Sequence, residues 1–242
     1  MQHNDRQMLV TGIGEIVDEI VRQGTGGQVQ ELLRRRLDPL LDAFLLESQP
    51  IVGAEVTILL ADIRGFTALT QSLPPRELID LLNRFFSRMC EVIKRHGGVI
   101  DKFIGDAVMG VFGVPVFRQD HVERAVRAAL HMQATLHKES RHGNPLLSAI
   151  GISIHTGIVV AGNVGSQTKM EYTVIGDSVN ITARLNALAA AGEVVVSQQV
   201  NDVIKANVAT ESIGLRAIKG KTEPVEVYKV LEKQPIDPDA TN

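Results

Sequence analysis

The chain has 242 residues, of which 44% are hydrophobic, so one good-sized domain with a buried core and an appendage is expected. Its net charge of −3 provides no strongly basic surface, and we therefore expect no nucleic-acid partner. The single cysteine, Cys90, excludes an internal disulfide, and no signal peptide or membrane span is recognised, which together predict a cytoplasmic protein.

Two apolar stripes at helical spacing run through the first fifty residues, over 8–21 and 29–44, with a flexible GTGG at 24–27 between them. Residues 1–50 are predicted to be a helical regulatory or dimerisation segment. The main domain is expected over residues 51–233 and a tail over 234–242. Whether an upstream sensor domain or a regulatory partner acts on this chain stays open.

Strands and helices alternate from residue 55 onward. Strands are predicted at 56–61, 147–157, 158–165, 193–197 and 225–231, helices at 74–96, 119–138 and 178–190, and a hairpin at 99–112. This order predicts an α+β sandwich with a mostly antiparallel sheet and helices packed on one face, preceded by the short helical appendage.

Two aspartates stand where the chain leaves a predicted strand. Asp62 ends an apolar run, and Asp106 follows Gly105 at the turn of the hairpin. Because a strand and the hairpin that follows it are usually neighbours, we expect both carboxylates at one edge of the sheet. Such a pair suits Mg²⁺ or Mn²⁺, which prefer oxygen ligands. The alternative is a helix N-cap at Asp62 and a turn aspartate at Asp106.

Two further stretches could bind a nucleotide. The turn 63–67, IRGFT, joins a strand to a helix, so its amides and the helix N-terminus could hold phosphates. Asn180 and Arg184 are four residues apart and share a helix face, where they could hold a ribose and a phosphate. The alternative for them is a solvated helix face. No histidines stand at metal-ligand spacing, and His96 is expected at a helix C-terminus, where its charge would be favoured.

Four stretches together resemble the class III nucleotidyl cyclase catalytic domain. They are LLADIRGFTALT, GGVIDKFIGDAVMGVFG, YTVIGDSVNITARLNALA and IKGKTEPVEVYKV, and the resemblance covers about residues 51–232. It implies a ferredoxin-like, palm-type fold and a homodimer. It also implies conversion of ATP to 3′,5′-cyclic AMP and pyrophosphate, with two Mg²⁺ or Mn²⁺ ions in each site.

The resemblance also implies roles for residues near the two aspartates. Asp62 and Asp106 match the metal-binding aspartates, and Ile63 belongs to the same metal site. The turn residues implied to contact the substrate are Gly65, Phe66 and Thr67.

Four other positions match residues of the family that bind ATP. Lys102 matches the residue that reads adenine, whose N1 accepts a hydrogen bond, whereas N1 of guanine carries a proton. Asn180 and Arg184 match the residues that orient the ribose and stabilise the α-phosphate. Lys219 matches a lysine that contacts the terminal phosphates, with Lys221 as a nearby second candidate.

One position departs from the pattern of many adenylyl cyclases. Thr173 stands where they carry an aspartate, and a hydroxyl can both accept and donate, so it discriminates less sharply. A threonine here resembles the branch that includes bicarbonate-responsive soluble cyclases. Two alternatives remain, a guanylate cyclase and a catalytically silent nucleotide-sensing module. Lys102 argues against the first. Against the second stands the presence of all four family residues, Asp62, Asp106, Asn180 and Arg184.

Overall fold

The computed structural model describes residues 52–114, 116–140, 150–166, 168–217 and 224–231. The predicted segment 1–50, the tail 234–242 and the two lysines Lys219 and Lys221 lie outside these ranges, so what was expected of them stays a prediction. Among the helices that the structure describes, none has the length and apolar character needed to cross a membrane.

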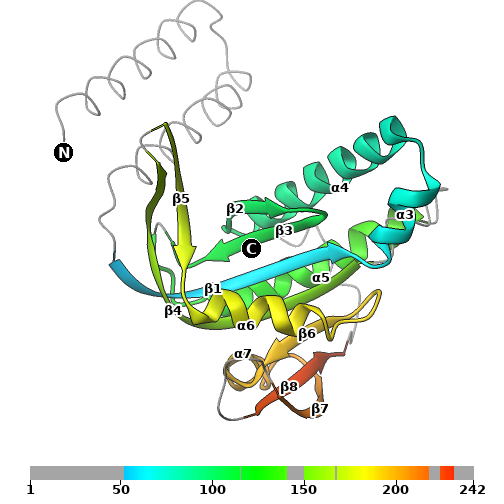
Figure 1. Cartoon of the computed structure of the whole chain (residues 1–242). Helices are drawn as coiled ribbons and strands as arrows, with labels where there is room; N and C mark the ends of the chain where they lie inside the picture. Colours follow the sequence, from blue (N-terminus) through cyan, green and yellow to red (C-terminus); the bar gives the residue numbers. More distant parts are fainter. Residues whose placement is uncertain (1–51, 115, 141–149, 167, 218–223, 232–242) are drawn as a thin grey trace, which may run out of the picture. The chain divides into compact units, whose positions relative to one another are not determined.

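The described elements form one alternating series (Figure 1). In order they are β1 (Val52–Ile63), α3 (Phe66–Ser72), α4 (Pro75–Arg95), β2 (Val99–Ile104), β3 (Ala107–Phe112), α5 (His121–Ser140), β4 (Ile150–Ser166), β5 (Lys169–Ile175), α6 (Asp177–Asn186), β6 (Val194–Ser197), α7 (Gln198–Ile204), β7 (Thr210–Arg216) and β8 (Val225–Val230). The predicted hairpin and the three predicted helices are confirmed. The strands expected at 147–157 and 158–165 are instead the single strand β4.

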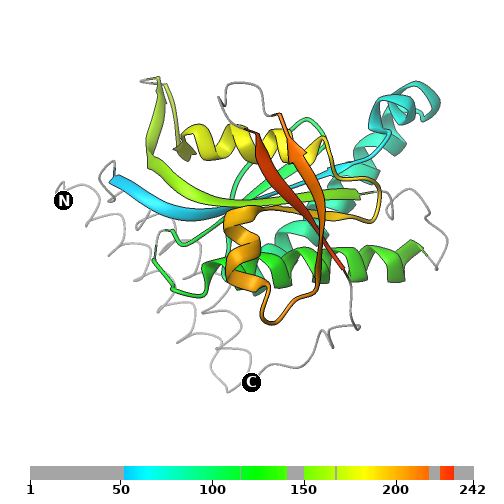
Figure 2. The same cartoon turned by 90° about the horizontal axis from the view of Figure 1, so that it is seen from below.

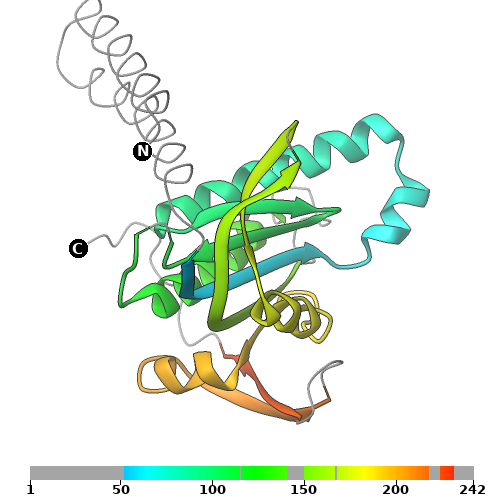
Figure 3. The same ribbon diagram turned by 60° about the vertical axis from the view of Figure 1, so that its left-hand side comes forward.

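The strands form a mixed sheet in the order β2-β3-β1-β4-β6-β8-β7, with β5 paired to β4. β1 pairs antiparallel with β3, and β3 with β2, while β4 and β6 run parallel. Figure 3 shows the hairpin β2–β3 alongside β1. The predicted α+β fold with a mostly antiparallel sheet is confirmed.

Helices cover both faces of the sheet, not one face as predicted. On β6, Val194 and Val196 belong to the larger core, which contains the buried side chains of α4, α5 and α7. Val195, between them, belongs to a second core with Ile181 and Leu185 of α6. Because successive side chains of a strand point to opposite faces, α6 lies across the sheet from α5. Figure 2 shows this arrangement.

Helix α4 fixes the hairpin β2–β3 against the larger core. Its buried residues recur at helical spacing, with Phe85 and Met89 fully buried, and it ends at Arg95, two residues before Gly97, whose φ of 78° is a left-handed conformation. At Gly98, a Cβ atom would lie 2.6 Å from the Phe112 ring, so only glycine allows this close approach. The helix and the hairpin therefore pack tightly together.

The chain divides into two compact units. The larger comprises Gly53–Val160 and Val174–Asn242, and the described part of the smaller is Val52 with residues 161–166 and 168–173. Thr173 thus belongs to the smaller unit, and the other described candidate residues belong to the larger.

Candidate functional site

Asp62 and Asp106 lie at the same edge of the sheet. Ala61 near the end of β1 is paired with Val108 of β3, which places the turn before β3 beside that end. The backbone N–H of Ile63 donates to Asp106 Oδ2 at 3.2 Å. The expected juxtaposition of the two carboxylates is therefore present, while their role in binding metal stays a prediction.

Burial and two charged neighbours determine the pKa of Asp62. Burial raises the pKa of its carboxyl above the usual value; Arg64 opposes the rise, and the neighbouring Asp106 adds to it. Arg64 Nη2 lies 2.6 Å from Asp62 Oδ1. That oxygen is buried and accepts no aligned hydrogen bond from the described residues, so the contact is an ion pair.

This chemistry fits a divalent cation. Two adjacent carboxylates and a buried carboxylate oxygen without a hydrogen-bond donor offer hard oxygen ligands. Within the described ranges, no three His, Cys, Asp or Glu side chains gather as a metal site. An ion held here by the two aspartates would have to complete its coordination with other groups, such as substrate oxygens.

The alternative role for Asp62, a helix N-cap, is not observed. Helix α3 begins after Gly65, whose φ of 75° lies in the left-handed region, and no side chain caps the helix. In the same turn Phe66 packs against the larger core, and the Thr67 side chain is exposed. The turn therefore places Asp62 at the rim without using it as a cap.

Lys102 is held by an acidic neighbour that sequence reasoning missed. Its Nζ lies 3.3 Å from Asp101 Oδ2, and the Asp101 side chain is only 5% exposed. Asp101 Oδ1 accepts a hydrogen bond from the backbone of Val174 at 3.1 Å. The pairing of β2 with β3 shifts register between Ile100 and Lys102, and this irregularity accommodates the buried Asp101 beside the partly exposed lysine.

Asn180 and Arg184 both lie on α6, as predicted. Asn180 is exposed, and Arg184 is half-buried. Arg184 Nη1 is buried and has no hydrogen-bond partner among the described residues. An unsatisfied buried guanidinium nitrogen is costly unless an acceptor reaches it, so Arg184 is suited to an anionic ligand. Thr173, in the smaller unit, is buried.

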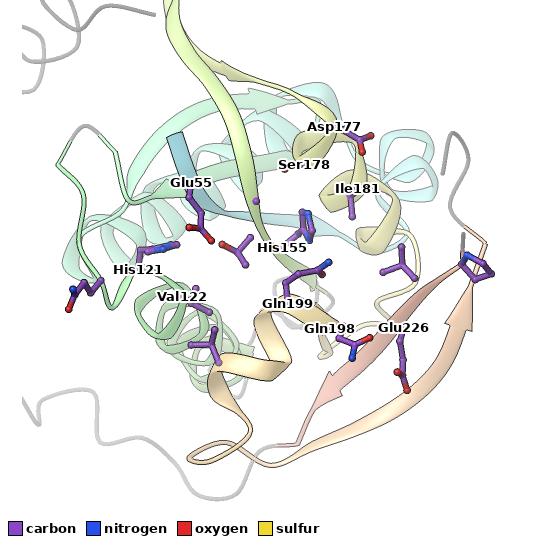
Figure 4. Close-up of a pocket in the computed structure, with 16 residues that line it drawn as sticks. Glu55, His121, Val122, His155, Asp177, Ser178, Ile181, Gln198, Gln199 and Glu226 are labelled. Carbon is purple, nitrogen blue, oxygen red and sulfur yellow. The ribbon is translucent and has the colours of Figure 1, made fainter. Parts of the chain in front are cut away.

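A cavity of about 750 Å³ opens elsewhere in the larger unit (Figure 4). Its lining includes Glu55 near the start of β1, seven residues from Asp62, so the two lie roughly 20 Å apart along the strand. Two buried histidines line it. His121 Nδ1 lies 2.7 Å from the Thr57 hydroxyl, and His155 Nδ1 lies 2.9 Å from the Ser197 hydroxyl. None of the predicted site residues that the structure describes lines this cavity.

His96 caps the C-terminus of α4, as predicted, but its charge is not favoured there. Burial, as the largest cause, together with the charges of His131, Arg127, Arg95 and Arg124, lowers its pKa to about 4. His96 Nε2 lies 3.1 Å from His131 Nδ1 on α5. Desolvation and the neighbouring cations lower the pKa of His96 by more than the helix dipole can raise it.

The chain matches the family described as "Adenylate and Guanylate cyclase catalytic domain" over residues 49–232. An adenylate cyclase of Anabaena cylindrica is 35% identical over 191 residues, which are 72% of this chain and 36% of that protein. The chain spans about a third of the length of the curated relatives it matches.

Solved structures of cyclase domains are also similar to this chain. The adenylyl cyclase CyaB of P. aeruginosa matches with a TM-score of 0.71 and 33% identity, over 77% of this chain and 98% of that one. A guanylate cyclase domain of Catenaria anguillulae, in complex with GTP, matches with a TM-score of 0.68 and 27% identity, over 75% and 98%. The fold, the two aspartates at one edge of the sheet and these similarities all point to the same family. The chain belongs to the family of adenylate and guanylate cyclase catalytic domains.

Proposed function

We propose that the chain is the catalytic domain of an adenylate cyclase, which converts ATP to 3′,5′-cyclic AMP and pyrophosphate. The observation that carries this proposal is the meeting of Asp62 and Asp106 at one edge of the sheet. The likeness to adenylate cyclases of Anabaena cylindrica and P. aeruginosa supports it.

In the proposed reaction the ribose 3′-oxygen attacks the α-phosphorus, and the bond to the β-phosphate oxygen breaks to release pyrophosphate. Two divalent ions held by Asp62, Ile63 and Asp106 would lower the pKa of the 3′-hydroxyl and neutralise the triphosphate. Arg184 supplies positive charge where the α-phosphate gains negative charge, and Asn180 orients the ribose. The hydroxyl proton passes to water or to the substrate.

The proposed active form is a homodimer with two equivalent sites at its interface. Asp62 and Asp106 of one chain face the nucleotide together with Lys102, Asn180 and Arg184 of the other. The buried Arg184 nitrogen without a partner in the described chain supports the placement of a substrate phosphate at this residue, because a phosphate oxygen would satisfy it. Lys219 would contact the terminal phosphates.

The choice of base is proposed to depend on Lys102, whose ammonium can donate to N1 of adenine. Its ion pair with buried Asp101 holds it in place. A contact of Thr173 with the base is proposed from the family resemblance alone. Because a threonine at this position resembles the bicarbonate-responsive branch, the assay is run with and without bicarbonate. The second candidate is a guanylate cyclase, which the likeness to a guanylate cyclase domain bound to GTP favours.

The test is turnover of ATP and, separately, of GTP by the purified chain with Mg²⁺ or Mn²⁺, with cyclic AMP and cyclic GMP quantified. Cyclic AMP as the main product supports the proposal. A preference for GTP would establish the second candidate, and no cyclic product from either nucleotide would leave a silent module.

A further inference from the structure

Arg64 makes three contacts that sequence reasoning did not foresee. Its Nη2 lies 2.6 Å from Asp62 Oδ1 in an ion pair, and it donates to the main-chain carbonyl of Asn186 at 2.8 Å and to the side-chain carbonyl of the same residue. One guanidinium nitrogen thus joins the proposed metal carboxylate to Asn186, the last residue of α6, which stands 122 positions after Arg64 in the chain.

The guanidinium lies over a glycine. A Cβ atom at Gly151 of β4 would lie 2.6 Å from Arg64 Cζ and overlap the nitrogens beside it. Arg64 Nε is buried, with no hydrogen-bond partner in the described part of the chain. The absence of a side chain at position 151 is therefore what allows Arg64 to reach Asn186.

Asn186 is itself fixed to the sheet. It is 3% exposed, and its Nδ2 donates to the carbonyls of Leu60 at 2.9 Å and Gly151 at 3.3 Å. The end of α6 is thereby bound to β1 and β4, and the Arg64 side chain connects it to the Asp62 carboxylate. Asn180 and Arg184 lie six and two residues before Asn186 on the same helix.

We propose that Arg64 is a positioning residue that occupies Asp62 in the absence of metal and couples metal binding at Asp62 to the end of α6. This inference rests on the proposed function, in which Asp62 binds metal and α6 supplies Asn180 and Arg184. In a two-fold dimer, α6 of one chain serves the other site, so each Arg64 connects the two sites.

The coupling follows from charge. A divalent ion bound to Asp62 is repelled by a guanidinium 2.6 Å from the ligating oxygen, so Arg64 must move away or weaken metal binding. Movement of Arg64 alters its hydrogen bonds to Asn186. Metal binding is therefore expected to change the protection of the last turn of α6.

The experiment measures two properties of the full chain without turnover. The chain is titrated with Mn²⁺ alone, and the electron paramagnetic resonance signal of the free ion at each point gives the metal affinity. Hydrogen exchange with and without Mn²⁺ reports on the last turn of α6. In the wild type, Mn²⁺ should speed exchange of that turn.

Two variants separate charge from packing. Arg64→Met keeps a long side chain without charge, so it should bind Mn²⁺ about threefold to tenfold more tightly and abolish the response of α6 to Mn²⁺. Arg64→Lys keeps a positive nitrogen that can approach the same oxygens, so it should restore both properties toward the wild type. The matched control is Arg76→Met, which replaces an exposed arginine at the start of α4 and should change neither property.

If Mn²⁺ does not change hydrogen exchange in the last turn of α6 of the wild type, the coupling is wrong. It is also wrong if the Arg64→Met variant has the Mn²⁺ affinity and the α6 response of the wild type. The Asp62→Ala variant distinguishes this failure from failure of the proposed function. If Mn²⁺ affinity is unchanged by Asp62→Ala, the metal assignment itself is wrong.

Discussion

The two rim aspartates give the most direct prediction at the scale of single residues. Asp62→Ala or Asp106→Ala should reduce cyclic nucleotide formation to background, because each removes a proposed metal ligand. The fold should survive, since neither side chain belongs to a hydrophobic core. Loss of the hydrogen bond from Ile63 N–H to Asp106 should cost only about 1 kcal/mol of unfolding free energy. Activity assays and urea unfolding test both statements.

The matched control for these variants is Asp80→Ala, which removes an exposed carboxylate from α4 and should leave turnover unchanged. Near-normal turnover by either rim variant would contradict the metal assignment.

Lys102 gives a prediction about the base. Lys102→Glu should reduce kcat/KM for ATP by roughly 5-fold to 150-fold, equivalent to about 1–3 kcal/mol, because a carboxylate would face the acceptor N1 of adenine. Asp101, 5% exposed, would also repel the new carboxylate. Lys102→Met separates these effects, since it removes the donor without adding a negative charge. Unchanged ATP turnover by both variants would show that Lys102 does not read the base.

At the scale of elements, the sequence predicted what depends on local pattern. Periodicity and the glycine turn identified α4, α5 and the hairpin, and the apolar run ending in an aspartate identified the rim position of Asp62. The sequence did not predict that helices cover both faces of the sheet at β6, because a short run of valines does not show which core each side chain joins. Nor could sequence alone pair Arg64 with Asn186, since their contact depends on the tertiary fold and on Gly151.

The contact between α4 and α5 should make stability depend on pH. His96 has a pKa of about 4 in the fold against an ordinary 6.5, so the unfolded chain binds the proton more readily between these values. Its contribution is therefore intact above about pH 6.5 and is lost as the pH falls toward 4. The facing groups are His131, Arg124 and Arg127 of α5, with Arg95 of α4.

The measurement is the urea midpoint at several pH values for the wild type and His96→Gln, which cannot titrate there. The wild type should lose stability more steeply than the variant across this window. Parallel pH profiles would show that His96 does not titrate as its surroundings indicate.

At the scale of the whole molecule, the proposed dimer predicts complementation. Asp106→Ala and Arg184→Ala should each be inactive alone. After random subunit exchange half of the dimers are mixed, and each mixed dimer holds one site with both substitutions and one intact site. About a quarter of the wild-type activity should therefore return. The control is a mixture of Asp62→Ala with Asp106→Ala, which affects the same half of the site and should stay inactive.

Cyclic AMP formation after mixing, together with a demonstration of exchange by differently labelled subunits, decides the matter. Exchange without recovery of activity would mean that one chain supplies the whole site.

The overlap between a side chain at position 151 and Arg64 has a consequence for how this sequence can diverge. While Arg64 is present, replacing Gly151 by even alanine places an atom inside the guanidinium. A lineage that keeps the guanidinium against Asn186 must therefore keep the glycine, because alanine would force the flexible arginine side chain away from this place, whereas loss of the arginine first removes the constraint. Substitutions at the two positions are expected to be inherited as a pair, in that order, although the positions stand 87 residues apart in the chain.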